Sequence, residues 1–256
     1  MKIRESIKKG LSVATGSMGL VLILFIFGAV WNLINVSLTP RLENPDAGTT
    51  AIIVGVGILF ILASIFVQAG SLGYVRDRLK LGKAEFASFM ASGSKYYIRL
   101  LLLGLFIALV VGAFVLLAAL VVALLANTLS TLGVILAVVI AAIGIYVAIL
   151  MFLAPYFIVV DGQKVIASVK NSISLVRKNL LKLLGVSLIL ILIGFGIGVV
   201  LGLVFALLSA AMKGAITAQY IFAVLSSFVN AFLGIVVTGS FMHFYLEASN
   251  NTSGAS

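Results

Sequence analysis

The sequence contains no cysteine, one histidine and only seven acidic residues among its 256 positions. The absence of cysteine excludes disulfides, thiol catalysis and cysteine-ligated metals. The few carboxylates and the single histidine argue against most enzyme classes, and no HExxH, GxSxG or Walker pattern occurs. We therefore predict no catalytic residue, no cofactor and no metal site, and we do not expect an enzyme.

Charge of either sign is also scarce. Charged residues make up 9% of the chain, hydrophobic residues make up 63%, and the mean hydropathy is +1.31. Soluble domains have roughly 25% charged and roughly 45–50% apolar residues. Because so few charges cannot cover a water-exposed surface, the composition predicts an all-α polytopic membrane protein.

Long uncharged stretches define the membrane spans, since a spanning helix needs about 20 apolar residues. The longest stretch, residues 100–160, is too long for one helix and is interrupted by polar residues at 127–131, which are typical of a tight turn. The prediction is one domain over 1–246 and a polar tail over 247–256. Six transmembrane helices are expected at about 16–38, 51–75, 99–126, 132–160, 180–212 and 219–246. Pro155 is expected to kink the fourth span near its end.

The basic residues indicate the orientation, because Lys and Arg are retained on the cytoplasmic side of a membrane. All of the 17 basic residues except Arg41 and Lys213 fall in the N-terminal segment, in the loops after the second and fourth spans, or at the adjoining ends of the next spans. We therefore predict a multi-pass protein of the cell membrane with both termini in the cytoplasm. The first apolar run is longer than a signal-peptide core and is expected to remain as a span.

The basic segments have a helical apolar period, which is typical of amphipathic helices at a membrane surface. The period occurs in the N-terminal segment from Lys2 to Ala14, in Ala84–Tyr97 and in Gln163–Asn179. We refer to these three segments as the elbows. The net charge of +10 has no feature that favours nucleic acid, and we expect anionic lipid headgroups as partners. The expected headgroup contacts are Lys8, Lys9, Lys95, Arg99, Lys170, Arg177 and Lys178.

The elbows also align with one another. Residues 6–10, 88–92 and 168–172 match at offsets of 82 and 80 residues, and each is followed by a pair of spans. This pattern predicts a threefold parallel repeat of an elbow and a helical hairpin, with units near 1–75, 76–160 and 161–246. The alternative is that basic loops make any six-helix protein look threefold.

Small residues spaced by four favour close helix contacts in lipid. The fifth span and the third span each have such a stripe of three residues. We predict packing within the chain, and the alternative is a seam between two copies. The residues are Gly194, Gly198, Gly202, Gly104, Ala108 and Gly112.

No ionisable residue lies deep in a predicted span, which argues against ion-coupled transport. The polar residues nearest the middle of the membrane are Tyr146 and Asn230, with Gln68 closer to the cytoplasm. We predict a hydrogen bond between Tyr146 and Asn230, and the alternative is a polar lining for a substrate path. At the outer end, Asn32, Asn35 and Asn127 either line a vestibule or mark the ends of spans. His243 and Glu247, four residues apart, predict a structural polar pair.

Two stretches resemble a known family. They run from Gly70-Ser71-Leu72-Gly73 through Gly82 and Phe86–Phe89 to Arg99-Leu100-Leu101, and from Pro155-Tyr156 through Ala167-Ser168, Ser172 and Ser174-Leu175-Val176 to Lys178-Asn179. Together they look like six-helix proteins related to the membrane domain of glycerophosphoryl diester phosphodiesterases. The resemblance implies a separate copy of a membrane module. Because nothing here matches such a catalytic domain, the resemblance implies no activity.

Two functions remain open. The first is a non-catalytic membrane module that organises lipid or serves as an accessory subunit of a membrane complex, with a protein partner or a second copy. It is motivated by the three basic elbows. The second is a permease or facilitator for a small neutral or amphiphilic solute. It is motivated by the glycine-rich spans, the repeat and the few polar residues near the middle of the membrane.

Overall fold

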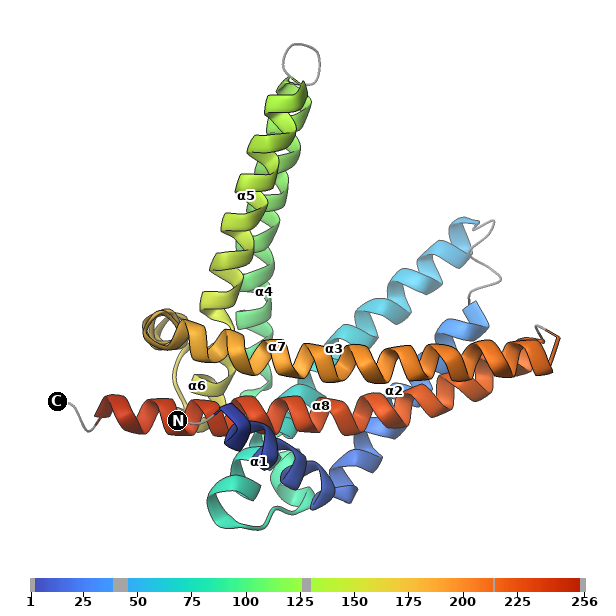
Figure 1. Ribbon diagram of the computed structural model, residues 1–256, viewed down its shortest axis with the longest axis horizontal. Helices are drawn as coiled ribbons and strands as arrows, with labels where there is room; N and C mark the ends of the chain where they lie inside the picture. Colours follow the sequence, from blue (N-terminus) through green and yellow to red (C-terminus); the bar gives the residue numbers. More distant parts are fainter. Residues whose placement is uncertain (1–2, 39–45, 126–129, 214, 254–256) are drawn as a thin grey trace. The chain divides into compact units, whose positions relative to one another are not determined.

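The computed structural model describes residues 3–38, 46–125, 130–213 and 215–253. All regular elements in these ranges are α-helices (Figure 1). Six helical stretches of the described residues are long and apolar enough to cross a membrane, which confirms the predicted all-α class and the six candidate spans. The helices are α1 (Ile3–Thr15), α2 (Met18–Leu38), α3 (Ala47–Leu81), α4 (Phe86–Leu125), α5 (Ser130–Met151), α6 (Ala154–Asp161), α7 (Val165–Ala211) and α8 (Ile216–Ser253).

Several predictions concern parts that lie outside the described residues. These parts are Arg41, Asn127 with most of the predicted turn at 127–131, and the last three residues of the tail. The choice of membrane, the orientation of the termini and the threefold repeat also stay predictions.

The chain divides into two compact units. The first unit contains Met1–Lys95 and Leu181–Ser256, and the second contains Tyr96–Leu180. One boundary falls inside α4 and the other inside α7, beside Asn179, whose φ of −125° and ψ of 20° interrupt the helix. The three repeat units predicted within one domain stay a prediction.

In the first unit, α8 is the helix on which the others pack. Helices α1, α2 and α3 all contact α8, and α1 lies beside the C-terminal half of α8 (Figure 1). The buried core gathers on these helices and is small. Its largest fully buried side chains include Leu20, Val21, Ile235, Met242, Phe244 and Tyr245. Apolar residues farther along the spans stay exposed, which suits a surface that faces lipid rather than water.

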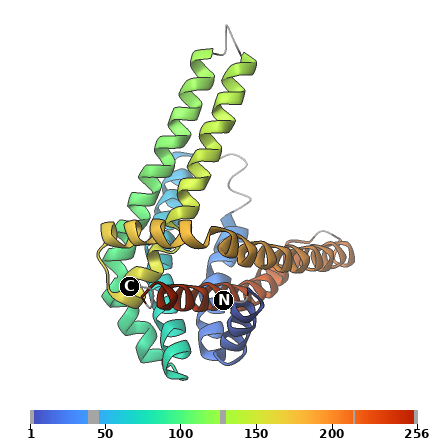
Figure 2. The same ribbon diagram turned by 60° about the vertical axis from the view of Figure 1, so that its left-hand side comes forward.

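In the second unit, α4 and α5 run side by side as a hairpin (Figure 2). A side chain added at Gly144 would meet Phe114, and one added at Gly133 would meet Leu125. The fourth span breaks after α5, and α6 begins with Pro155 in its first turn. Because proline lacks a backbone N–H and its ring clashes with the preceding turn, the helix cannot run through this point unbroken. The predicted kink is confirmed.

Two helix ends show why the local sequence forms these elements. The side chain of Asp46 accepts a hydrogen bond of 2.6 Å from the backbone N–H of Thr49 and so caps the first turn of α3. That hydrogen bond lowers the pKa of Asp46 below its usual value. At the other end, Gly82 has a φ of 73°, a left-handed conformation that glycine adopts without strain. Helix α3 therefore ends just before the second elbow.

Candidate functional site

The first elbow forms α1, and its two faces differ. Its buried residues are Ser6, Gly10, Val13 and Ala14, which form the face packed against α8. On the other side, a shallow cavity of about 550 Å³ is lined by Arg4, Glu5, Lys8, Lys9 and Ser12. Lys8 and Lys9 are exposed, as expected for residues that contact headgroups. The ammonium groups of Lys8 and Lys9 therefore lie on a helix whose opposite face is packed against α8.

The other expected headgroup residues lie on α4 and α7. Lys95, Lys170, Arg177 and Lys178 are exposed. Arg99 is only half-exposed, and its guanidinium donates a hydrogen bond of 2.6 Å to the carbonyl of Gly162, just after α6. Arg99 therefore also holds the start of the loop that leads into the third elbow.

Small residues fix each elbow against a span. A methyl group added at Gly10 would overlap Ser240 of α8, and one added at Gly73 of α3 would overlap Ser92 of the second elbow. In the third elbow, Ser172 is fully buried and donates a hydrogen bond of 2.8 Å to the carbonyl of Leu150. In each case the helix backbones can approach closely only because the side chains at the contact are small.

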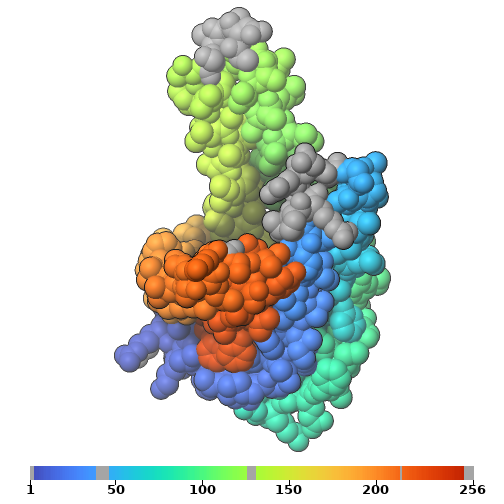
Figure 3. Space-filling view, turned by 90° about the vertical axis from the view of Figure 1, so that its right-hand side faces the viewer, coloured from blue at the N-terminus to red at the C-terminus, as the bar shows by residue number. Residues whose placement is uncertain are grey.

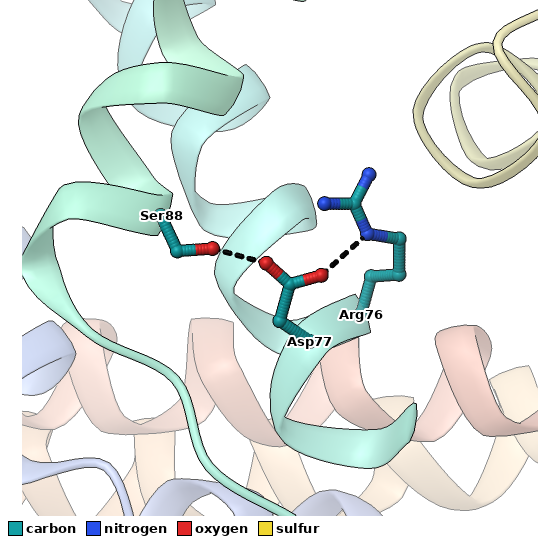
Figure 4. A network of polar contacts seen from close by, with 3 residues as sticks. All are labelled: Arg76, Asp77 and Ser88. Atoms are coloured by element: carbon teal, nitrogen blue, oxygen red, sulfur yellow. Dashed lines mark hydrogen bonds and ion pairs between the residues drawn. The ribbon is translucent and has the colours of Figure 1, made fainter. Parts of the chain in front are cut away.

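A polar cluster joins the end of α3 to the second elbow (Figure 4). The guanidinium of Arg76 donates a hydrogen bond of 2.7 Å to one carboxylate oxygen of Asp77, and the hydroxyl of Ser88 donates to the other. Asp77 lies two residues after the predicted end of the second span, on the basic side. The carboxylate thus links α3 to the first turn of α4 around the bend at Gly82.

His243 lies between Ser6 of α1 and Glu247 of its own helix. The hydroxyl of Ser6 is 3.3 Å from Nδ1 of His243, and the nearest carboxylate oxygen of Glu247 is 3.9 Å from the same nitrogen. A catalytic triad needs its serine and its carboxylate on opposite ring nitrogens, and Ser6 is fully buried. In the described part of the chain, no group of three or more His, Asp or Glu side chains is placed to hold a metal ion. The geometry favours a structural polar contact between α1 and α8.

A second cavity, of about 530 Å³, lies between α2, α7 and α8 of the first unit. We refer to it as the amide groove. Asn32, Asn35 and Asn230, which the sequence singled out separately, line it together. Two further polar side chains, Gln219 and Ser226, also line it and were not predicted. Their only signal in the sequence is their spacing from Asn230 on one helix face, and that spacing does not say which helices lie opposite.

The other predicted residues are placed as follows. Tyr146, Asn230 and Gln68 are exposed, and none of the three makes a side-chain hydrogen bond within its own unit as described. A hydrogen bond between Tyr146 and Asn230 would join the two units and stays a prediction. Among the described residues, no heavy atom comes within 4 Å of a side chain built at any glycine of the two predicted stripes. Packing of those stripes against the other unit or a second copy also stays a prediction.

Comparison with known proteins gives a match to a family model. Residues 1–248 match the family model of a domain of unknown function, DUF7847. No curated protein and no solved structure matches the chain. The resemblance to phosphodiesterase membrane domains therefore stays a prediction.

Proposed function

The chain belongs to the family DUF7847, and we propose that it is a non-catalytic integral membrane module that associates with anionic lipid through its basic elbows. The observation that carries the proposal is the basic face of α1. Arg4, Lys8 and Lys9 line one cavity there, while the opposite face of the helix is buried against α8. A fixed cluster of cations attracts a phosphate headgroup, and each cation near the surface contributes about 1 kcal/mol.

The proposal extends to the threefold repeat. Gly73 and Ser92 are 19 residues apart, and so are Leu153 and Ser172, so the second and third elbows each contact the preceding span at an equivalent point. The first elbow has no preceding span, and its Gly10 contacts Ser240 of the last span. These contacts support three equivalent units of an elbow and a hairpin. The Lys and Arg residues of the elbows favour the cytoplasmic surface for them.

The test is native mass spectrometry of the full chain extracted from vesicles of phosphatidylcholine and phosphatidylglycerol. The charge-reversal variant Lys170→Glu with Arg177→Glu is expected to retain fewer molecules of phosphatidylglycerol than the wild type. Lys213→Glu is the matched control, because Lys213 lies outside the elbows, and it should retain as many as the wild type. Equal retention in all three proteins would remove the lipid part of the proposal. A stoichiometric protein partner, found after gentle extraction from the native membrane, would favour the accessory-subunit role.

A permease or facilitator for a neutral or amphiphilic solute is the second candidate function. The amide groove favours it, because uncharged polar side chains there extend from the outer end of α2 toward the middle of α8. Release of a trapped neutral solute from vesicles would test it. Release that is no faster than from protein-free vesicles would count against this function.

A further inference from the structure

The amide groove carries a polar stripe along one helix. Gln219, Ser226 and Asn230 follow one another on α8 at spacings of seven and four residues, which place side chains on the same helix face. At 1.5 Å per residue, the stripe is about 16 Å long. Asn32 and Asn35 line the groove from α2, and Gly198 lines it from α7. Figure 3 views the side of the molecule where α7 and α8 (orange) lie beside α2 (blue).

The stripe has unused hydrogen-bonding capacity. The amide of Asn32 donates a hydrogen bond of 2.8 Å to the hydroxyl of Ser227 and so ties α2 to α8. Within the described residues, by contrast, the side chains of Gln219 and Asn230 make no hydrogen bond. Asn230 is exposed on a helix that is apolar enough to cross a membrane. A carboxamide that faces hydrocarbon without a hydrogen-bond partner is unfavourable. A polar ligand at this point would supply the hydrogen bonds that the chain does not.

The lining also restricts the chemistry of that ligand. None of the described residues that line the groove is charged, so a phosphate or carboxylate would find no cation among them. Carboxamides both donate and accept hydrogen bonds, and so do hydroxyl groups. The rings of Phe205 and Phe222, whose centroids are 4.8 Å apart, give the groove an apolar wall. The groove therefore suits a molecule with an uncharged, hydroxyl-rich head and an apolar chain.

We propose that the amide groove binds a membrane lipid whose headgroup is an uncharged sugar or glycerol. The headgroup bonds to the carboxamides of Asn230 and Gln219, and an acyl chain lies against Phe205 and Phe222. A lipid is favoured over a soluble sugar because Asn230 is exposed on a helix that is apolar enough to cross a membrane. The site is separate from the basic elbows, because no residue of the elbows lines it, so it does not depend on the anionic-lipid proposal.

The experiment offers the purified full chain an equimolar mixture of monogalactosyl diacylglycerol and phosphatidylglycerol and measures retention of each by native mass spectrometry. The wild type is expected to retain the galactolipid. Asn230→Leu removes one of the two carboxamides that bond to the headgroup and is expected to weaken retention of the galactolipid about fivefold to tenfold. Gly198→Leu places a large side chain in the groove from α7 and is also expected to weaken retention of the galactolipid.

Two control variants keep the test specific. Gly194→Leu makes the same change as Gly198→Leu, one turn earlier on α7. A side chain at Gly194 also meets open space, but Gly194 does not line the groove. Asn171→Leu makes the same change as Asn230→Leu at an exposed position of the third elbow. Both controls should retain the galactolipid as the wild type does. Circular dichroism should show equal thermal stability for Asn230→Leu and the wild type, since Asn230 makes no hydrogen bond within the described residues.

Three results would overturn the proposal. The first is galactolipid retention that is unaffected by both Asn230→Leu and Gly198→Leu. The second is stabilisation by methyl galactoside as strong as that by the galactolipid, which would make a soluble polyol the ligand. The third is a change in the ratio of monomer to dimer in Gly198→Leu without selective lipid retention, which would make the groove an interface between two copies. The Lys170→Glu, Arg177→Glu variant separates the two proposals, because it should lose phosphatidylglycerol and keep the galactolipid.

Discussion

Ser172 replaces a missing helix bond at Leu153. Its hydroxyl oxygen accepts a hydrogen bond of 3.1 Å from the backbone N–H of Leu153 and donates one of 2.8 Å to the carbonyl of Leu150. Leu150 lies in α5, and Leu153 directly precedes α6. One side chain of the third elbow thus satisfies backbone groups on both sides of the break that Pro155 requires. Such a substitute is needed because an unpaired backbone group in hydrocarbon is unfavourable.

Ser172→Ala should therefore destabilise the protein. The change leaves the N–H of Leu153 buried without a partner, which costs about 1–3 kcal/mol. Thermal unfolding in detergent, followed by circular dichroism, should show a lower midpoint than for the wild type. Ser174→Ala, two residues away at an exposed position of the same helix, should leave the midpoint unchanged. Equal midpoints for both variants would contradict the role of Ser172.

Gly73→Ala should also destabilise the protein, because the added methyl group overlaps Ser92. Overpacking of this kind costs about 1–3 kcal/mol. Adding Ser92→Gly should recover part of the loss, since the double variant places the small residue on the other helix, as occurs at Gly10 and Ser240. The control is Gly57→Ala on the same helix, where the methyl group meets open space. A double variant less stable than Gly73→Ala would show that the two positions do not share one contact.

The sequence predicted the spans because hydrocarbon imposes a simple requirement. A helix in lipid needs a long apolar run, and proline interrupts it, so six spans and the break near Pro155 follow without knowledge of the partner helices. The contacts between helices do not follow in this way. Ser92 and Ser172 are ordinary small polar residues in the sequence, and they matter because Gly73 and Leu153 lie beside them.

The first elbow shows the same limit. The apolar period of Ile3, Ile7, Leu11 and Ala14 suggested the face that would leave water. Of these residues Ala14 is buried, but the buried face also contains Ser6 and Gly10, and Leu11 is 48% exposed. Small residues allow α1 to approach α8 closely, and Leu11 stays available to lipid. A periodicity of hydrophobicity does not distinguish burial in protein from contact with lipid, because both environments are apolar.

The amide groove could be predicted only in part from the sequence, for a related reason. Each asparagine of the groove is visible in the sequence, but an asparagine near the end of a span also occurs where water begins. That Asn35 on α2 and Asn230 on α8 line one cavity depends on how three helices pack. That arrangement is not encoded in any one segment.

Asp77 and Ser88 should be energetically coupled. Asp77 accepts hydrogen bonds from both Arg76 and Ser88, and residues in one network typically show coupling of about 0.5–3 kcal/mol. A double-mutant cycle of Asp77→Ala and Ser88→Ala, measured by chemical unfolding in detergent, should give a favourable coupling energy. The same cycle with Ser94→Ala, an exposed position on α4, should give none. Additive effects in both cycles would mean that the contact does not tie the second elbow to α3.

Asp46 should make the start of α3 sensitive to acid. Its hydrogen bond from the backbone of Thr49 lowers its pKa below the usual 3.8, so the cap stabilises the folded state above that value. This stabilisation is lost as the pH falls through the lowered pKa. Carboxyl carbon NMR of the labelled protein should place the pKa of Asp46 below 3.8, and the amide protection factor of Thr49 should fall over the same pH range. In Asp46→Asn, the neutral side chain still caps the helix, so protection of Thr49 should no longer change there; a normal pKa in the wild type would rule out the cap.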